Sequence, residues 1–154
     1  MPYSKFTLDE LKQKFNIILT GNKGKFNNLP EVAPSQFILE ALEEYLPLAV
    51  AIGSEKARSE LIVAPILVAI KKHLNKQISL FSGIEFNVDI ELGLNGFCDF
   101  IISNSTQQFF IESPVIALVE PKNDNLKSGL AQCMAEMVAC LLYTSDAADE
   151  GWCG

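Results

Sequence analysis

The sequence predicts an α+β domain of the sandwich type, with helices first, a mostly antiparallel meander of strands in the centre and a helix last. Three observations predict it. Apolar side chains recur at helical spacing up to residue 74, short β-rich runs fill residues 78–120, and helical spacing returns after residue 122. A chain of 154 residues that is 49% hydrophobic and 20% charged can bury one core, and this composition excludes intrinsic disorder.

Three helices in the first half of the chain are predicted from their first residues. Thr7 precedes Glu10 by three positions, which is the pattern of a capping box, and it opens a helix through about Phe15. From Ser35 onward, apolar residues recur at helical spacing on one face while glutamates occupy the other. Ser54 caps a further long helix, whose basic last turn suits the helix dipole.

The strands of the predicted sheet lie between residues 78 and 120. Residues 85–92 alternate polar and apolar side chains, as in a strand with one buried face. Asn95-Gly96 is a strong signal for a hairpin turn, and residues 97–102 and 115–119 are apolar on both faces, as in a covered sheet. The predicted runs are Ile78–Phe81, Ile84–Leu92, Gly96–Ser103, Gln107–Ile111 and Pro114–Glu120.

The last predicted helix follows Lys122, with Asn123 or Asp124 as its N-cap. Its apolar stripe consists of Leu126, Leu130, Cys133 and Met137.

From Cys140, eleven consecutive residues resemble the conceptual translation of a transposase-type sequencing adapter. We therefore expect an N-terminal helical region (1–53), a core (54–139) and a foreign tail (140–154). The alternative is a natural helix end followed by an acidic loop.

The composition narrows the functions that the chain can have. A formal net charge of −7 disfavours a protein that coats nucleic acid, but it allows a metal site built from acidic residues. No Gly-rich phosphate loop, Ser/His/Asp set or Cys/His zinc spacing occurs, and the four cysteines indicate free thiols in a reducing compartment. The longest apolar run, Leu61–Ile70, is about half of a membrane span, so we expect a soluble, cytoplasmic protein with no membrane partner.

Charged residues interrupt the apolar strands at two places. Asp99 lies within the apolar run 97–102, where an unpaired carboxylate is costly to bury. Glu120 and Lys122 are two positions apart at a strand end, so they project to the same side. Adjacent strands lie about 5 Å apart, so Asp99 can stand beside Glu120. Two carboxylates that close need a proton or a metal between them, and oxygen ligands favour Mg²⁺ or Mn²⁺.

These residues carry a family resemblance. Asp99, a gap of about twenty residues, the triplet Glu120-Pro121-Lys122 at a strand end and a following helix with Gln132 resemble the motif of the PD-(D/E)XK nuclease superfamily, which has the restriction-endonuclease-like fold. Glu60 on the preceding helix adds a fourth element, and the resemblance covers about residues 55–137. It implies a Mg²⁺-dependent deoxyribonuclease, an endonuclease rather than an exonuclease, which acts on DNA in defence or repair. A homodimer or a larger defence complex is the assembly it would form.

The resemblance implies a metal site and a ligand set. Asp99 and Glu120 would ligate Mg²⁺ or Mn²⁺ together with the backbone carbonyl of Pro121. Glu60, which shares the apolar face of its helix, would bind the same ion directly or through water, or would hold a second ion. The ion would polarise a phosphodiester and lower the pKa of a bound water.

The same resemblance implies catalytic roles for two further residues beside Asp99 and Glu120. Lys122 would orient or help deprotonate the attacking water and would stabilise the negative charge on the phosphate. Gln132 would position Lys122 or that water. Lys127, near the start of the last helix, could meet a phosphate of the DNA backbone.

The sequence departs from the superfamily motif in two places. Cys98, and not proline, precedes Asp99. Pro121 has no N–H, which suits only an edge strand, a bulge or a strand end. The superfamily core also has a further strand after the Gln132 helix, and that strand would fall within or beyond the tail. We therefore expect a core that is incomplete at its C-terminus.

Three alternatives stay open at this point. Asp99, Lys122 and Glu120 can form a buried ion-pair network that needs no metal. A catalytically silent domain of the same fold can serve in nucleic-acid binding or in assembly, since a fold does not fix a function. A truncated fragment can lack an activity that its full-length parent has.

Overall fold

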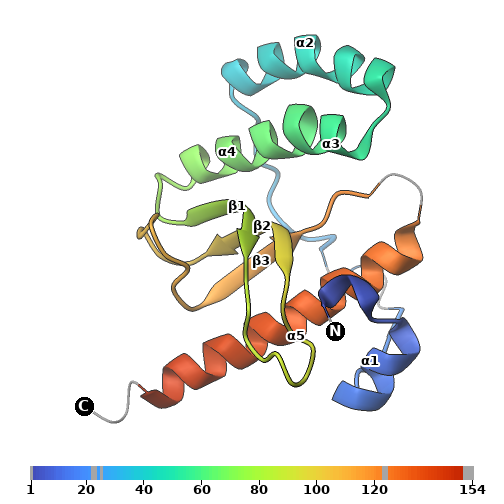
Figure 1. Ribbon diagram of the computed structural model, residues 1–154. Coiled ribbons are helices and arrows are strands. Elements are labelled where there is room, and N and C mark those ends of the chain that lie inside the picture. Colours follow the sequence, from blue (N-terminus) through green and yellow to red (C-terminus); the bar gives the residue numbers. More distant parts are fainter. Residues whose placement is uncertain (1, 22–23, 25, 123–124, 151–154) are drawn as a thin grey trace.

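The computed structural model of the chain describes residues 2–21, 24, 26–122 and 125–150, and it confirms the α+β class (Figure 1). Helices precede a three-stranded antiparallel sheet, and a long helix follows it. The elements are a 3-10 turn (Tyr3–Lys5), α1 (Leu8–Phe15), α2 (Gln36–Ile52), α3 (Glu55–Arg58), a π-helical turn (Ser59–Val63), α4 (Ala64–His73), β1 (Ser79–Glu85), β2 (Phe97–Ser103), β3 (Val115–Val119) and α5 (Leu126–Glu150).

The three predicted helix starts are confirmed by side-chain caps. Thr7 forms a capping box at α1, in which its hydroxyl accepts from the Glu10 N–H over 3.2 Å and the Glu10 carboxylate accepts from the Thr7 N–H over 2.8 Å. The Ser35 hydroxyl caps α2, and the Ser54 hydroxyl accepts from the Ala57 N–H over 3.0 Å at the start of α3. Each cap satisfies a backbone donor that the helix itself leaves without a partner.

Helices cover both faces of the sheet, whose strand order is β1-β2-β3 (Figure 1). On one face, Leu67 of α4 packs with Phe100 and Ile102 of β2. On the other face, α5 and the N-terminal segment pack on Phe81 and Ile101. Helix α2 lies outside α3 and α4, away from the sheet, so it forms an outer layer of its own (Figure 1).

The strand predicted for Ile84–Leu92 is wrong beyond Glu85, the last residue of β1. Residues 86–96 instead form an irregular arm of the β1–β2 hairpin. The N-terminal segment packs on this arm, since the Tyr3 hydroxyl donates to the Phe86 carbonyl over 2.6 Å. A side chain from far away in the sequence therefore takes a backbone acceptor of this arm.

The turn of the hairpin also differs from its predicted position at Asn95-Gly96. The tip lies at residues 90–93, where the Gly93 N–H donates to the Ile90 carbonyl over 3.1 Å. Gly96 has a φ of 139°, and a Cβ added there would come within 3.2 Å of the Tyr3 ring. Gly96 is therefore needed for close packing of the N-terminal segment, and not for the turn.

The run Gln107–Ile111, predicted as a strand, is irregular in the structure. The side-chain amide of Gln108 donates to the Leu80 carbonyl over 2.7 Å and accepts from the Leu80 N–H over 3.2 Å. One side chain thus satisfies backbone groups of β1 that a further strand would otherwise pair with. Edge groups of a sheet need some such partner.

Helix α5 begins at Leu126, and the predicted caps Asn123 and Asp124 lie outside the described residues. Asn125 acts as a cap, because its side-chain oxygen accepts from the Ser128 N–H over 3.1 Å. The predicted apolar stripe is wrong as a buried face, since three of its members, Leu126, Leu130 and Met137, are exposed and Cys133 is half-buried.

Small residues, and not the predicted stripe, form the buried face of α5. Ala131, Ala135 and Ala139 are almost fully buried against the core. Residues four apart on a helix share a face, and alanine side chains allow the helix to approach the sheet closely. The larger apolar side chains of α5 are consequently turned outward.

Residues 140–150, the described part of the predicted tail, continue α5 without a break. Tyr143 packs edge-on against the Phe86 ring, and its hydroxyl donates to the Ile111 carbonyl over 2.8 Å. That this segment is foreign stays a prediction.

The cysteines at 98, 133 and 140 are free thiols, and Cys153 lies outside the described residues. Within the described residues, no helix combines the length and the apolar character needed to cross a bilayer.

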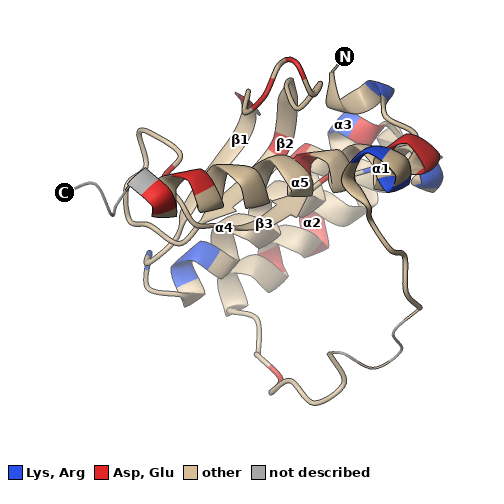
Figure 2. Cartoon of the chain, turned by 90° about the horizontal axis from the view of Figure 1, so that it is seen from below, with Lys and Arg blue, Asp and Glu red and all other residues tan. Residues whose placement is uncertain are grey.

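Charged side chains are distributed unevenly over the helices. Lys and Arg are divided among the N-terminal 3-10 turn, α1, α3, the end of α4 and the first turn of α5, with Lys76 and Lys122 in connecting segments (Figure 2). Helix α2 carries three glutamates and no basic residue. The basic side chains of the described residues therefore belong to separate elements.

Candidate functional site

Asp99 and Glu120 lie side by side at one end of the sheet, as the sequence predicts. Phe100 of β2 pairs with Val119 of β3, so the next positions toward that end are Asp99 and Glu120. The Asp99 N–H donates to the Glu120 Oε1 atom over 3.2 Å, and only 3% of the Glu120 side chain is exposed. The antiparallel register therefore places two acidic residues together although 21 positions separate them in the sequence.

Asp99 lies where the alternation of β2 side chains between the two faces breaks. Phe100 packs on the α4 side, while Ile101 and Cys98 both pack on the α5 side. Gly83, the residue of β1 opposite Asp99, has a φ of 60°, a conformation that glycine adopts readily. Asp99 borders a cavity of about 290 Å³ on the α3–α4 side of the sheet, together with Ser59.

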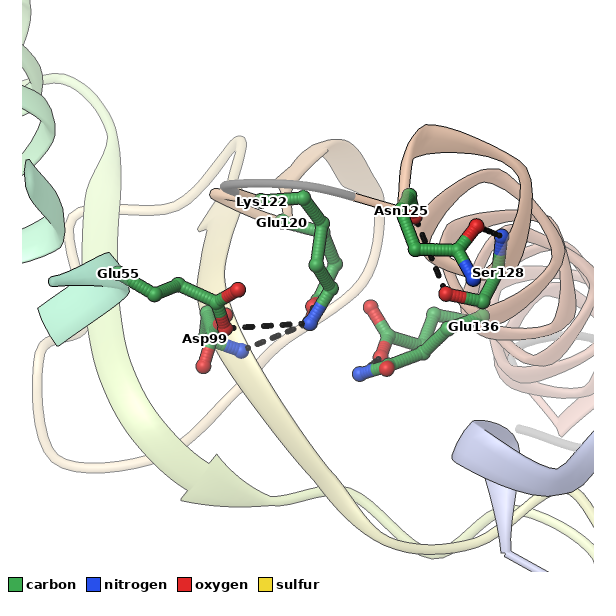
Figure 3. Close-up of polar contacts among 8 residues, drawn as sticks. Glu55, Asp99, Glu120, Lys122, Asn125, Ser128 and Glu136 are labelled. Carbon is green, nitrogen blue, oxygen red and sulfur yellow. Dashed lines mark hydrogen bonds and ion pairs between the residues drawn. The ribbon is translucent and has the colours of Figure 1, made fainter.

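Lys122 supplies the positive charge of the site (Figure 3). Its ammonium nitrogen lies 3.4 Å from Glu120 Oε2 and 3.5 Å from Glu55 Oε1. Gly129 on α5 makes room for the lysine stem, because a Cβ at that position would lie 2.4 Å from Lys122 Cγ. A glycine inside the first turns of α5 is thus explained by the path of the Lys122 side chain.

Burial and neighbouring charges change the acidity of these groups. Burial, followed by the charge of Glu120, raises the pKa of Asp99 to about 6. Burial alone would lower the pKa of Lys122, but the carboxylates of Glu120 and Glu55 raise it above its ordinary value. Lys122 is therefore a stable ammonium ion, whereas Asp99 takes up a proton near neutral pH more readily than an exposed aspartate.

Glu136 of α5 belongs to the site although the sequence reasoning missed it. Its side chain is fully buried, at 0% exposure, and its Oε1 atom accepts from the Gln132 amide over 3.0 Å. Burial, followed by the charge of Glu120, raises the pKa of Glu136 to about 8. The signal in the sequence was helical spacing, because Glu136 is three and four residues before Ala139 and Cys140, which are buried on α5.

Glu60, predicted as a metal ligand, forms an exposed ion pair instead of a contact with Asp99 or Glu120 among the described hydrogen bonds and ion pairs. Its carboxylate pairs with Lys56 over 2.7 Å, and 59% of its side chain is exposed. It borders the same cavity as Asp99. Glu60 lies in the π-helical turn Ser59–Val63, which differs in residue spacing from the regular α-helix that the sequence predicts there.

The other predicted residues take varied positions. Pro121 is buried between Glu120 and Lys122 in the chain, so its carbonyl belongs to the site by sequence neighbourhood. Gln132 donates to Glu136, and not to Lys122. Lys127 is exposed on the first turn of α5.

The donor set fits a hard divalent cation by its chemistry. Glu120 Oε2 and Glu136 Oε2 are buried oxygen atoms without a hydrogen-bond partner, and carboxylate oxygens are the ligands that Mg²⁺ and Mn²⁺ prefer. Around Lys122 the carboxyl groups outnumber the single ammonium ion, which leaves negative charge that a proton or a cation can balance. Among the described residues, however, no three acidic, histidine or cysteine side chains already surround one point as ligands.

Comparison of the chain with protein-family models, with curated proteins and with solved structures gives no match.

Proposed function

We propose that the chain is a Mg²⁺- or Mn²⁺-dependent nuclease-like domain that hydrolyses phosphodiester bonds of DNA, in a defence or repair setting. The observation that carries the proposal is the meeting of Asp99, Glu120 and Lys122 at the sheet end, within ion-pair or hydrogen-bond distance. Two adjacent carboxylates and a lysine are the groups that metal-assisted phosphodiester hydrolysis needs.

Each residue has a task in this reaction. Asp99 and Glu120, with the Pro121 carbonyl, would hold the ion, which when bound polarises the phosphate and acidifies a water. The Lys122 ammonium, kept protonated by its carboxylate neighbours, stabilises negative charge on the phosphate and orients the attacking water. Gln132 acts through Glu136, to which it donates, and so fixes that carboxyl group.

The two sides of the site differ in access. The cavity beside Asp99 opens on the α3–α4 side, and Glu60, which also lines it, would contact the ion through water. A second hollow of about 350 Å³ is lined by Glu120, Lys122 and Gly129 on the α5 side. DNA would approach at this end of the sheet, where the bound ion offsets the acidic charge of the chain.

The alternative is a catalytically silent domain of the same fold that serves in binding or assembly. Two observations favour it. The Lys122 ammonium is already paired with Glu120 and Glu55, and the described carboxylates do not surround one point. The apolar side chains exposed on α2 also offer a surface that an assembly would bury.

Plasmid cleavage tests the proposal. Wild-type protein, Lys122→Ala and the exposed control Lys56→Ala are incubated with supercoiled DNA in Mg²⁺ or in chelator, and circular dichroism establishes that each is folded. Cleavage that needs the ion and disappears only in Lys122→Ala is the expected result. Retarded DNA migration without cleavage, weakening steeply with salt, supports the alternative. Folded protein that neither cleaves nor retards DNA contradicts both.

A further inference from the structure

Glu136 presents a buried acceptor that the rest of the chain does not satisfy. Its Oε1 atom accepts from Gln132, while its Oε2 atom has no hydrogen-bond partner. The Cys98 thiol also approaches this carboxyl group, but a thiol is a weak donor. A fully buried carboxyl oxygen without a donor is costly, so its environment must supply a proton or a positive charge.

Glu120 faces Glu136 and also has a buried oxygen atom without a hydrogen-bond donor. The two carboxyl groups come within hydrogen-bonding reach of each other, from the end of β3 and from α5 respectively. Glu120 Oε2 is also buried without a hydrogen bond, and its one ion-pair contact, with Lys122, is 3.4 Å long. Figure 3 shows Glu136 projecting from α5 toward Glu120 and Lys122. Two carboxylates that face each other repel unless a proton, a hydrogen-bond donor or a cation lies between them.

Groups of the chain that could join them are already engaged or are neutral. The Lys122 ammonium is shared between Glu120 and Glu55. Burial raises the pKa of the Cys133 thiol, which therefore stays protonated and does not act as a thiolate ligand. A hollow of about 350 Å³ is lined by Glu120, Lys122 and Cys133, on the Glu120 side of this place.

We propose that Glu136 is a further ligand of the divalent-cation site, and that it binds Mg²⁺ or Mn²⁺ opposite Glu120 in the seam between the end of β3 and α5. The seam, defined as Glu120 and Glu136, lies on the α5 side, whereas Asp99 borders the cavity on the α3–α4 side. Glu120 belongs to the seam and also accepts the hydrogen bond from Asp99, so it links the two sides of the site. This assignment rests on the proposed metal dependence and adds an α5 ligand to it.

Gln132 has a positioning role in this arrangement. It is four residues before Glu136 on α5, and its amide holds Oε1 so that Oε2 is turned toward Glu120. A ligand held by a neighbouring hydrogen bond has a fixed orientation, and this is how proteins ordinarily prepare their metal ligands.

Calorimetric titration of the whole chain with Mn²⁺ tests the assignment. Glu136→Gln preserves the shape of the side chain and removes its charge, and Glu44→Gln on the outer helix α2 is the control on an exposed glutamate outside the site. We expect Glu136→Gln to weaken Mn²⁺ binding by about tenfold or more, Glu120→Gln to abolish it and Glu44→Gln to leave it unchanged. A folded Glu136→Gln variant that binds Mn²⁺ like the wild type overturns the assignment.

The outcomes separate this inference from the proposed function. Loss of binding in Glu120→Gln with full binding in Glu136→Gln overturns the Glu136 assignment and leaves the proposed metal dependence intact. Wild-type protein that is folded and binds no Mn²⁺ overturns both. If Glu136→Gln does not fold, the carboxyl ¹³C resonance of Glu136 in the wild-type chain decides: a shift on saturation with Mg²⁺ supports the ligand role, and an unchanged resonance overturns it.

Discussion

Two regions of the molecule differ in what they bury. One is the seam of Glu120 and Glu136 between β3 and α5, and the other is the outer helix α2. In the seam, Glu120 and Glu136 are withdrawn from water, with side-chain exposure of 3% and residue exposure of 0%. On α2, large apolar side chains are open to solvent, and Phe37 and Val50 are 70% and 63% exposed. The interior thus holds charge at one place, while the surface holds apolar groups at another.

From this difference in burial we infer which region depends on a specific ligand. A buried carboxyl group is costly unless a proton or a cation accompanies it, so the seam marks a site with a defined occupant. Leaving an apolar side chain exposed costs only the stabilisation that its burial would give, about 25 cal/mol per Å². A protein with such a surface can therefore remain folded without one particular partner. Changes in the seam should therefore have large and pH-dependent effects, and changes on α2 small ones.

The largest effect on stability is expected when the positive charge of the site is removed. Lys122→Met leaves Glu120 and Glu55 without their ammonium partner and should lower the free energy of unfolding at pH 7 by about 3 kcal/mol. Urea denaturation at pH 7 measures this change in the free energy of unfolding. Lys127→Met, on the exposed first turn of α5, is the control and should change stability by less than about 0.5 kcal/mol. Equal stability of the two variants would contradict the importance of charge balance at the sheet end.

The pH dependence of stability gives the next largest effect. The pKa of Glu136 is about 8 in the folded chain against an ordinary value of 4.5, so the folded state binds more protons between these values. Its contribution is therefore fully present below about pH 4.5 and is lost as pH rises toward 8. The charged and ionisable groups that face Glu136 are Tyr3, Cys98, Asp99, Glu120, Cys133 and Cys140.

Glu136→Gln should flatten that profile, since glutamine keeps the volume and cannot ionise. Asp99, with a pKa of about 6, adds a smaller slope of the same sign between its ordinary value of 3.8 and 6. Denaturation midpoints measured from pH 4.5 to 9 check this prediction. A wild-type profile that rises with pH over this range would show that Glu136 is ionised throughout.

A smaller effect is expected at Gly129. Alanine improves helix propensity by about 1 kcal/mol, but the new Cβ would lie 2.4 Å from Lys122 Cγ and must displace that side chain. We expect Gly129→Ala to lower stability by about 1 kcal/mol net. In the Lys122→Ala background, where no stem is present, the same substitution should be stabilising. Identical effects in both backgrounds would remove the link between Gly129 and Lys122.

The smallest effect is expected on α2. Val50→Lys replaces an exposed side chain and should change the free energy of unfolding by less than about 0.5 kcal/mol. Ala49, the adjacent and fully buried residue, is the matched position, and Ala49→Lys should cost about 2 kcal/mol or more. A large loss in Val50→Lys would show that this face of α2 is covered in solution.

Local signals account for what could be predicted from the sequence. The helix starts at Thr7, Ser35 and Ser54 depend on hydrogen bonds within three residues, so a short window contains all the necessary information. Asp99 beside Glu120 follows from strand spacing and antiparallel order. The caps need only neighbouring residues, and the pairing of Asp99 with Glu120 needs only regular geometry of two adjacent antiparallel strands.

Distant contacts account for what could not be predicted. Tyr3 and Gln108 satisfy backbone groups of Phe86 and Leu80, which are remote in the sequence, and they replace two predicted pieces of strand. Glu136 is buried because its alanine neighbours turn that face of α5 toward the core. Glu60 pairs with Lys56 on the exposed side of its helix, and the π-helical turn in which it lies was not signalled by the sequence pattern.

The central claim is that the carboxylates at the sheet end hold a divalent cation. Its most direct test is calorimetric titration of Mn²⁺ into the folded wild-type chain and into Asp99→Asn and Glu120→Gln, with circular dichroism on the same samples. We predict saturable binding by the wild type that is lost in both variants. Folded wild-type protein that takes up no Mn²⁺ would contradict the claim and leave a structural ion-pair network around Lys122.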